Sequence, residues 1–178
     1  MIDQNYLKEC VTYDTKTGAM TWRTRPENHF KNAHAANAWN AQHALREAGT
    51  ISETHGIRYR QVQIGLAFYK THRLAWLYVT GAHPKNQIDH ISGDGLDNRI
   101  ANLRDVTNLE NHRNMKMSRA NTTGVCGVHP HKGKYKAQIR ANGKTRHLGT
   151  FDTVADAARA RKIAEKQYGY HENHGRIQ

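Results

Sequence analysis

Apolar positions in this chain fall into short groups, and the spacing within the groups changes from helical to strand-like along the sequence. In the first group, Leu7 and Val11 stand four residues apart, and a turn-forming run at 14–18 separates them from a Thr-Trp pair that ends at Trp22. A helix-period segment, an Asp/Thr/Gly turn and a strand predict a helix packed against a hairpin. We expect Trp22 to lie in the core.

Three further elements are predicted before residue 82. The alanine-rich stretch Ala33–Leu45 predicts a second helix that ends before a glycine. Ile57–Ile64 alternates apolar and polar residues, and a glycine and a second apolar stretch follow, which predicts a hairpin. The apolar run Leu74–Val79 predicts a short buried helix, with His72 placed before it as a cap or satisfied histidine rather than a ligand.

Strand-like alternation returns in the last third of the chain. Gly124–Val128, Lys134–Arg140 and Lys144–Phe151 predict three strands joined by tight turns, of which Asn142-Gly143 is a strong hairpin signal. Thr153 and the acidic residue three positions later predict the start of an alanine-rich helix. We expect this helix to cover the apolar face of the three-stranded sheet.

The central part of the chain combines two strand signals with a loop of turn-forming residues. A short segment ends in Asp89-His90, a run of Gly, Asp and Asn follows, and strand-forming residues return near Leu103. Thr107 and Glu110 stand three apart, the spacing of a capping box, which predicts a helix from Asn108. The expected order is strand, long loop, strand and helix.

Three polar side chains of this central part point to phosphodiester hydrolysis. Asp89 and Asn111 offer the carboxylate and amide oxygens that hold Mg²⁺ or Mn²⁺, and two protein ligands leave positions for phosphate and water. His90 can accept a proton from an attacking water near neutral pH. An ordinary surface turn is the alternative for an isolated Asp-His pair. A calcium loop is excluded because the twelfth-position Glu is missing.

This stretch resembles the HNH nuclease motif, a ββα-metal finger. His90 matches the first position, Asn102 the central one and Asn111 the third, where Asn replaces the last His as in the homing-endonuclease branch. The resemblance implies that Asn102 belongs to the active site by pinning the loop, and that a divalent metal is the cofactor, with Mg²⁺ preferred and Mn²⁺ as the alternative. His112, about 100° around the helix from Asn111, is the weaker candidate for the third position.

Basic residues surround the motif. Arg99 and Arg104 flank the central Asn and would clamp phosphate oxygens in a nuclease, and solvated surface charge is the equal alternative. After the predicted helix the sequence turns polar and basic, and Arg113, Lys116 and Arg119 can track a phosphate backbone. We expect a domain boundary near residue 120.

The charge of the chain is concentrated toward its C-terminal end. The 178 residues carry a net charge of +12, residues 1–112 hold 13 Lys/Arg against 11 Asp/Glu, and residues 113–178 hold 14 against 4. This asymmetry predicts nucleic acid as the partner. An anionic membrane surface is the alternative, but no basic amphipathic helix with bulky apolar residues is evident.

The two cysteines and the lack of long apolar runs argue against a zinc-ribbon, disulfide-rich, secreted or membrane protein. Cys10 and Cys126 are far apart in the sequence, so neither a zinc ribbon nor a disulfide framework is predicted. No signal peptide or membrane-spanning run is recognisable, so we expect a soluble cytoplasmic protein with no membrane contact and no evident protein partner. The hydrophobic content of 37% favours small modules with local cores.

The last third of the chain resembles the APETALA/ethylene-response-factor type of DNA-binding domain, a three-stranded sheet backed by one helix. The resemblance rests on two Gly-Val pairs at 124–128, the middle strand from Lys134 to Ile139, a His-Leu-Gly-x-Phe run at 147–151 and an Ala pair in the helix. It implies DNA contacts from the face of the sheet opposite the helix. The candidates are Lys136, Gln138, Arg140, Lys144 and Arg146.

The sequence therefore predicts an α+β protein: a ββα-metal (HNH) nuclease domain followed by a small three-stranded antiparallel sheet plus helix DNA-binding domain. The predicted division is an N-terminal helix and hairpin segment, the nuclease core, a basic linker and the DNA-binding domain, at 1–54, 55–117, 118–121 and 122–178. The predicted function is metal-dependent cleavage of duplex DNA, most simply as a nick. An inactive DNA-binding regulator and a structure-specific or RNA-directed nuclease are the alternatives.

Overall fold

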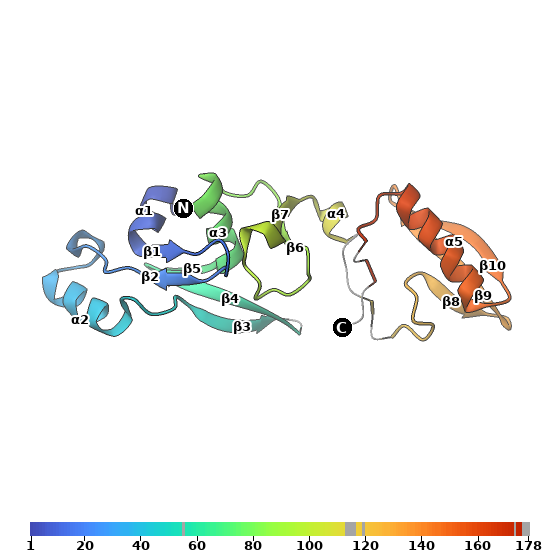
Figure 1. The fold of residues 1–178 in the computed structure, drawn as a ribbon, viewed down its shortest axis with the longest axis horizontal. Coiled ribbons are helices and arrows are strands. Elements are labelled where there is room, and N and C mark those ends of the chain that lie inside the picture. Colours follow the sequence, from blue (N-terminus) through green and yellow to red (C-terminus); the bar gives the residue numbers. More distant parts are fainter. Residues whose placement is uncertain (55, 113–116, 119, 173, 176–178) are drawn as a thin grey trace. The chain divides into compact units, whose positions relative to one another are not determined.

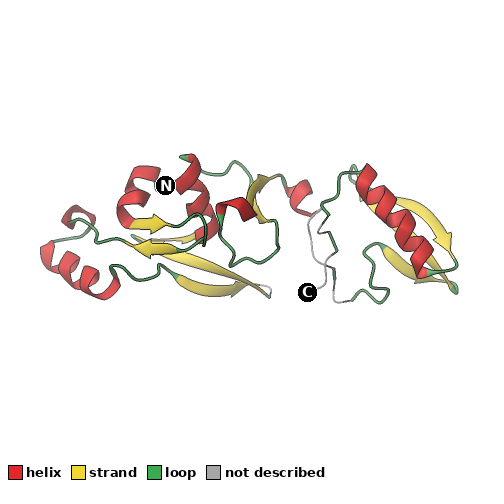
Figure 2. Ribbon diagram, viewed as in Figure 1, coloured by secondary structure: helices red, strands yellow, loops and turns green. Residues whose placement is uncertain are grey.

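The computed structural model describes the chain except residues 55, 113–116, 119, 173 and 176–178 and the side chains of Leu109 and His112. The chain forms two compact units, Met1–Thr107 and Asn108–Gln178 (Figure 1). In the described residues, three small antiparallel sheets belong to the first unit and one to the second. This mixture of helices and separate small antiparallel sheets is compatible with the predicted α+β class (Figure 2).

The predicted helix and hairpin at the N-terminus are confirmed. They comprise α1 (Gln4–Cys10), β1 (Val11–Tyr13) and β2 (Met20–Trp22). Asp3 begins the helix, because its side chain accepts a hydrogen bond of 2.9 Å from the backbone N–H of Tyr6. Trp22 is buried, as predicted, and meets the ring of Trp39 edge-on with centroids 5.0 Å apart.

The second predicted helix is confirmed with a shorter C-terminal end. After the 3₁₀ turn Glu27–His29, α2 spans Ala33–His43, and Leu45 has a positive φ of 64°. The chain leaves the helix there because the next segment joins a sheet. That segment is β3 (Thr50–Thr54), a strand the sequence analysis missed because most of its side chains are polar and exposed. Its pairing with the following strand makes it a strand.

The predicted hairpin is confirmed as β4 (Ile57–Ile64) and β5 (Ala67–Lys70), and the sheet has the order β3-β4-β5. The next helix, α3 (Thr71–Thr80), begins before its apolar run. His72 therefore lies in the first turn of α3, and the prediction that it precedes the helix is wrong. The apolar pattern could not reveal a first turn made of Thr, His and Arg.

The core of the first unit joins its N-terminal and central parts. Leu7 of α1, Met20 of β2, Val62 of β4, and Leu74 and Leu77 of α3 are all at most 2% exposed and belong to one cluster. Burial of each large aliphatic side chain contributes about 1.5–3 kcal/mol. The N-terminal segment is thus part of the same unit as the segment that carries Asp89 and His90.

The second unit contains α4 (Asn108–His112), β8 (Val128–His131), β9 (Lys134–Ala141), β10 (Lys144–Phe151) and α5 (Val154–Gln167). The sheet order is β10-β9-β8, and α5 packs on it (Figure 1). The prediction of a first strand at Gly124–Val128 is wrong by four residues. Gly124 and Gly127 have φ of 71° and 75°, which places them in turns rather than in a strand.

Two absences concern the described residues. None of the helices that the structure describes combines the length and apolar character needed to span a bilayer. Cys10 is buried and Cys126 is half-buried, and both are free thiols.

Candidate active site and nucleic-acid interface

The predicted strand, loop and strand around Asp89-His90 are confirmed. β6 (Gln87–His90) pairs antiparallel with β7 (Leu103–Val106), so that Asp89 lies opposite Arg104 and His90 opposite Leu103. The loop between them includes a 3₁₀ turn, Ile100–Asn102. This pairing closes the loop and brings its two ends together at His90.

The Asp89 carboxylate is buried and held by Arg104. Only 8% of Asp89 is exposed, and the Arg104 guanidinium donates two hydrogen bonds of 2.9 and 2.6 Å to Oδ2. A buried carboxylate requires such compensation. Arg104 was predicted as a phosphate clamp or a surface charge, and the structure places it as the partner of Asp89.

His90 is 6% exposed, and polar and aromatic side chains lie around its imidazole. Its Nε2 lies 3.4 Å from Oδ1 of Asn98, and its ring centroid lies 5.0 Å from that of His72 and 6.0 Å from that of Tyr59. Burial lowers the pKa of His90 below its usual value, while Asn98 and nearby carboxylates oppose that shift. A neutral imidazole is the form that can accept a proton.

Asn102 joins the two ends of the loop. Its Oδ1 accepts a hydrogen bond of 2.9 Å from the N–H of Ser92, and its Nδ2 donates one of 2.8 Å to the carbonyl of Asp97. Only 7% of Asn102 is exposed, so both bonds are partly shielded from water. Asn102 thus ties Ser92 to Asp97 across the loop, and its role in an active site stays a prediction.

Two residues from the N-terminal hairpin support the same loop, and the sequence analysis did not find them. The Tyr13 hydroxyl donates a hydrogen bond of 2.7 Å to the carbonyl of Asn98. Gly18 has a φ of 77°, and a Cβ there would lie 2.5 Å from the backbone nitrogen of Arg99. Asn98, at 2% exposure, was also missed as the partner of His90. No spacing in the sequence links Tyr13 and Gly18 to a loop about 80 residues away, and the turn-forming run around Asn98 gave no sign of its contact with His90.

The other predicted residues of the motif are placed as follows. Arg99 makes hydrogen bonds of 2.7 and 2.6 Å to the two carboxylate oxygens of Asp97, and its side chain is 53% exposed. Asn111 lies in α4, as predicted, and belongs to the second unit, so its meeting with Asp89 stays a prediction. Arg113, Lys116 and Arg119 lie outside the described residues.

The described residues around Asp89 could hold a hard divalent cation such as Mg²⁺ only together with a further oxygen ligand, for which an amide oxygen is suitable. No group of three His, Cys, Asp or Glu side chains arranged to hold a metal occurs among the residues that the structure describes. Asp89 supplies one buried carboxylate beside His90. An Asp and an Asn oxygen together are suitable ligands for Mg²⁺, which keeps several waters.

The sheet β10-β9-β8 carries the predicted DNA-binding residues on both of its faces. Ala137, Ile139 and Ala141 of β9 are buried on the side of α5, so Lys136, Gln138 and Arg140 lie on the opposite side. Residues that pair across neighbouring strands lie on the same face, so His129, Thr145 and His147 lie on this side as well. We call this surface the outer face, made of His129, Lys136, Gln138, Arg140, Thr145 and His147.

Lys144 and Arg146 lie on the other face of that sheet. They pair with the buried residues Ala141 and Ile139, and the guanidinium of Arg146 lies 5.8 Å from the ring centroid of Tyr168 at the end of α5. The sequence analysis listed these two residues with those of the outer face because the family resemblance implied DNA contacts from the sheet.

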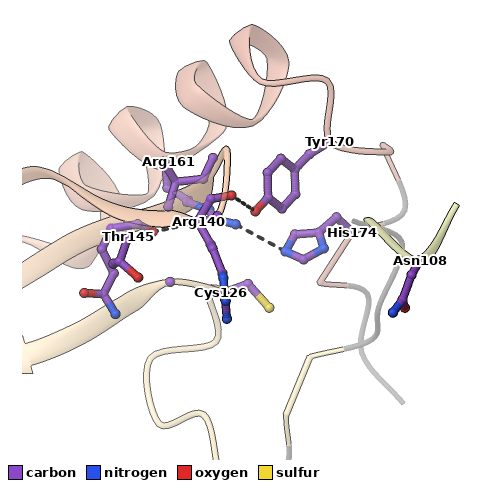
Figure 3. Close-up of a pocket in the computed structure, with 11 residues that line it drawn as sticks. Asn108, Cys126, Arg140, Thr145, Arg161, Tyr170 and His174 are labelled. Carbon is purple, nitrogen blue, oxygen red and sulfur yellow. Dashed lines mark hydrogen bonds between the residues drawn. The ribbon is translucent and has the colours of Figure 1, made fainter. Parts of the chain in front are cut away.

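A pocket of about 600 Å³ lies at one end of this sheet (Figure 3). In it, Arg161 of α5 is 4% exposed and donates hydrogen bonds of 2.9 Å to Glu165 and 2.6 Å to the carbonyl of Gln138. The Tyr170 hydroxyl donates one of 2.7 Å to the carbonyl of Arg140. These donors satisfy β9 carbonyls beyond the point where pairing with β8 ends, which gives the pocket a structural role.

Two comparisons with known proteins agree with this geometry. A family model described as HNH endonuclease matches residues 69–113, which include β6, the pinned loop, β7 and α4. Protein 3.8 of Escherichia phage T7 is 33% identical to the chain over 93 residues, covering 49% of this chain and 77% of Protein 3.8. The chain belongs to the family of T7 Protein 3.8. No solved structure gives a significant match.

The family-model match supports an HNH endonuclease domain at residues 69–113, in the middle of the chain. This supports a nuclease-type enzyme with DNA as the substrate that the domain implies. HNH nucleases in general use a divalent metal, which agrees with the cofactor predicted from the residues.

Proposed function

We propose that the chain is a metal-dependent HNH endonuclease that hydrolyses phosphodiester bonds of duplex DNA, with residues 122–178 as its DNA-binding domain. The observation that carries the proposal is the buried pair Asp89 and His90, beside a loop that Asn102 pins, in the segment matched by the HNH endonuclease model. A buried carboxylate and imidazole at the end of one strand are an active-site arrangement that a solvated turn would not require.

His90 is the proposed general base. In the tautomer with hydrogen on Nε2, the ring donates to Oδ1 of Asn98, and Nδ1 carries the lone pair that accepts a proton from the attacking water. Asn98 and the rings of Tyr59 and His72 restrict the rotation of the imidazole. The chain thus holds the base in one orientation before substrate arrives.

Asp89 and Asn111 are the proposed metal ligands. A bound Mg²⁺ would supply charge stabilisation at the phosphate and the departing 3′ oxygen. Arg104 holds the Asp89 carboxylate through Oδ2 and so orients it toward that role. A single HNH domain per chain predicts a nick in one strand.

The outer face of the second unit is the proposed DNA anchor. Lys136 and Arg140 supply cations for phosphates or guanine, and Gln138 between them can read adenine. The charge of the last third, 14 Lys/Arg against 4 Asp/Glu, favours a polyanion. This assignment extends the resemblance to the APETALA/ethylene-response-factor fold and is independent of the nuclease chemistry.

A plasmid-nicking assay tests the proposed function. Wild-type protein with Mg²⁺ or Mn²⁺ should convert supercoiled plasmid to the open circle, and EDTA should stop the conversion. His90→Ala should lower the rate by about 10²–10⁴-fold while DNA binding persists, because loss of a general base has effects of that size. The matched control is His34→Ala, at an exposed position of α2.

The control should cleave at the wild-type rate. Plasmid that stays supercoiled at every wild-type dose, with both metals, would contradict the enzyme and leave a DNA-binding protein. Cleavage of RNA or branched DNA in preference to duplex DNA would contradict the substrate.

A further inference from the structure

The sheet β3-β4-β5 has one face that carries no acidic side chain. Its strand register places Ser52 opposite Tyr59, Gln61 opposite Lys70 and Gln63 opposite Phe68, and cross-strand partners share a face. We call this surface the Tyr59 face, made of Ser52, Tyr59, Gln61, Gln63, Phe68 and Lys70. The opposite face carries Val62 and Ile64, which are buried in the core.

The Tyr59 face adjoins the proposed active site. The Tyr59 ring lies 6.0 Å from the His90 ring and 5.5 Å from the His72 ring, centroid to centroid. The loop of the HNH motif rests on the same ring, because a Cβ added at Gly95 would lie 2.8 Å from Tyr59 Cε1. DNA that reaches His90 therefore comes close to this part of the sheet.

Lys70 is the cation of the Tyr59 face. Its ammonium lies 5.1 Å from the centroid of the Tyr59 ring and 3.3 Å from the Ser52 hydroxyl. No carboxylate forms a salt bridge with Lys70 in the part of the chain that the structure describes. By contrast, Arg99 and Arg104 are each held by an aspartate.

The distances set how far Lys70 lies from the proposed base. The 5.1 and 6.0 Å separations share the Tyr59 centroid, so the ammonium and the His90 ring lie at most about 11 Å apart. A duplex strand advances about 3.4 Å per nucleotide along its axis, so that distance spans at most about three nucleotides. The charge of Lys70 is felt at the neighbouring ring of His72, 5.0 Å from that of His90, because Lys70 is among the positive groups that add to burial in lowering the pKa of His72.

We propose that Lys70 is a substrate-binding residue of the nuclease that contacts a backbone phosphate of the cleaved strand, at or next to the scissile position. This inference rests on the proposed function and assigns it a phosphate contact outside the motif. A lysine ammonium is a compact point charge that can meet a phosphate in many orientations. The Tyr59 ring and Ser52 hydroxyl hold that ammonium in place without neutralising it.

The test compares Lys70→Met and Lys70→Arg in the full chain with Lys8→Met. Lys8 is the matched control because its ammonium also lies over a tyrosine ring, 5.5 Å from the centroid of Tyr78. The Tyr78 ring meets the ring of Tyr13 edge-on, whereas the Tyr59 ring lies beside two histidines. Nicking rates are measured with Mg²⁺. Affinity for a duplex oligonucleotide is measured from 50 to 300 mM salt in the His90→Ala background, which prevents cleavage.

Lys70→Met should lower kcat/KM about tenfold and reduce the slope of log affinity against log salt by about 1, as expected for one lost phosphate contact. Lys70→Arg should recover most of both, and Lys8→Met should match wild type. A merely structural lysine would leave the salt slope unchanged. If Lys70→Met does not fold, Lys70→Gln gives the same comparison.

The inference is overturned if wild type nicks DNA and the Lys70 variants show the wild-type salt slope and rate. It is also overturned if Lys8→Met lowers the slope as much as Lys70→Met does. Failure of the proposed function is a different result, because wild-type protein itself would then leave plasmid uncut.

Discussion

The two units place their polar residues in opposite ways. In the first unit, Asp89, His90, Asn98 and Asn102 are all less than 9% exposed and are tied into hydrogen bonds. In the second unit, Arg140 and its neighbours on the outer face are exposed or half-buried. Proton transfer requires groups held in one orientation away from bulk water, whereas a phosphate backbone is met by cations that solvent can reach.

The second unit also has a buried charge pair, but it serves the fold. Arg161 and Glu165 are 4% and 7% exposed and stand one helical turn apart on α5. The guanidinium satisfies the carbonyl of Gln138, a residue of the outer face. Burial of charge therefore does not by itself mark a catalytic site. Arg161 binds its own helix and a strand carbonyl, whereas Asp89 and His90 lie side by side at the end of a strand.

The largest expected effect is on the stability of the second unit. Arg161→Leu should lower its free energy of unfolding by about 3–5 kcal/mol, because Glu165 would remain buried without its main partner. Denaturant unfolding followed in the far-UV measures this loss. The double variant Arg161→Leu, Glu165→Leu is the control and should recover much of the stability. Equal destabilisation of both variants would show that the pair's mutual attraction is not what matters.

In the first unit, the largest effect should follow removal of the loop pin. Asn102→Ala leaves the N–H of Ser92 and the carbonyl of Asp97 without the side chain that now satisfies them. We expect a loss of about 1–3 kcal/mol in unfolding free energy, the cost of leaving one hydrogen-bonding group unsatisfied, because both bonds are only partly buried. Nicking should fall more than DNA binding does. The exposed Asn37→Ala on α2 is the control.

Unchanged nicking by Asn102→Ala would remove this residue from the proposed site. Loss of DNA binding as large as the loss of nicking would show that the variant damages more than the first unit.

Local pattern predicted most elements, because each has its own signal. The Asn-Gly turn and strand alternation placed β9 and β10, and the Thr153 cap placed the start of α5, where the Thr153 side chain accepts from the N–H of Asp156. β3 was missed because Thr50–Thr54 becomes a strand through its partner rather than its own composition.

The candidate site was predictable where spacing carries it and not where packing does. The Asp89-His90 pair and Asn102 follow from the resemblance to a known motif. Tyr13 and Tyr59 reach the loop and His90 from distant parts of the sequence, and Asn98 meets His90 only because the loop folds back on it. Similarly, only the register separates Arg140 from Arg146.

A pH titration should reveal the buried histidine of the first unit. Burial, followed by the charges of His90, Arg73 and Lys70, lowers the pKa of His72 to about 3. The unfolded chain binds a proton near the usual value of about 6.5, so folding stability falls as pH decreases from 6.5 toward 3. The expected slope from this residue is about 1.4 kcal/mol per pH unit.

Unfolding free energies measured at several pH values, for wild type and His72→Gln, check this slope. Between pH 6 and 4, the unfolding free energy of the variant should change with pH by about 1.4 kcal/mol per pH unit less than that of wild type. An unchanged slope would show that His72 is protonated or solvated in the folded protein.

The smallest expected effect compares two arginines on opposite faces of one sheet. Arg140 lies on the outer face opposite Thr145, whereas Arg146 pairs with Ile139 on the side of α5 and lies over Tyr168. Arg140→Ala should weaken DNA binding by about 1–2 kcal/mol and reduce the salt slope by about 1, because it removes a direct contact. Arg146→Ala should change affinity by a few tenths of a kcal/mol through long-range charge alone.

Titration of a labelled duplex at several salt concentrations separates the effects of the two variants. Equal losses would mean that DNA does not lie on the outer face, while a larger loss for Arg146 would transfer the contact to the side of α5 and leave the outer face to another partner.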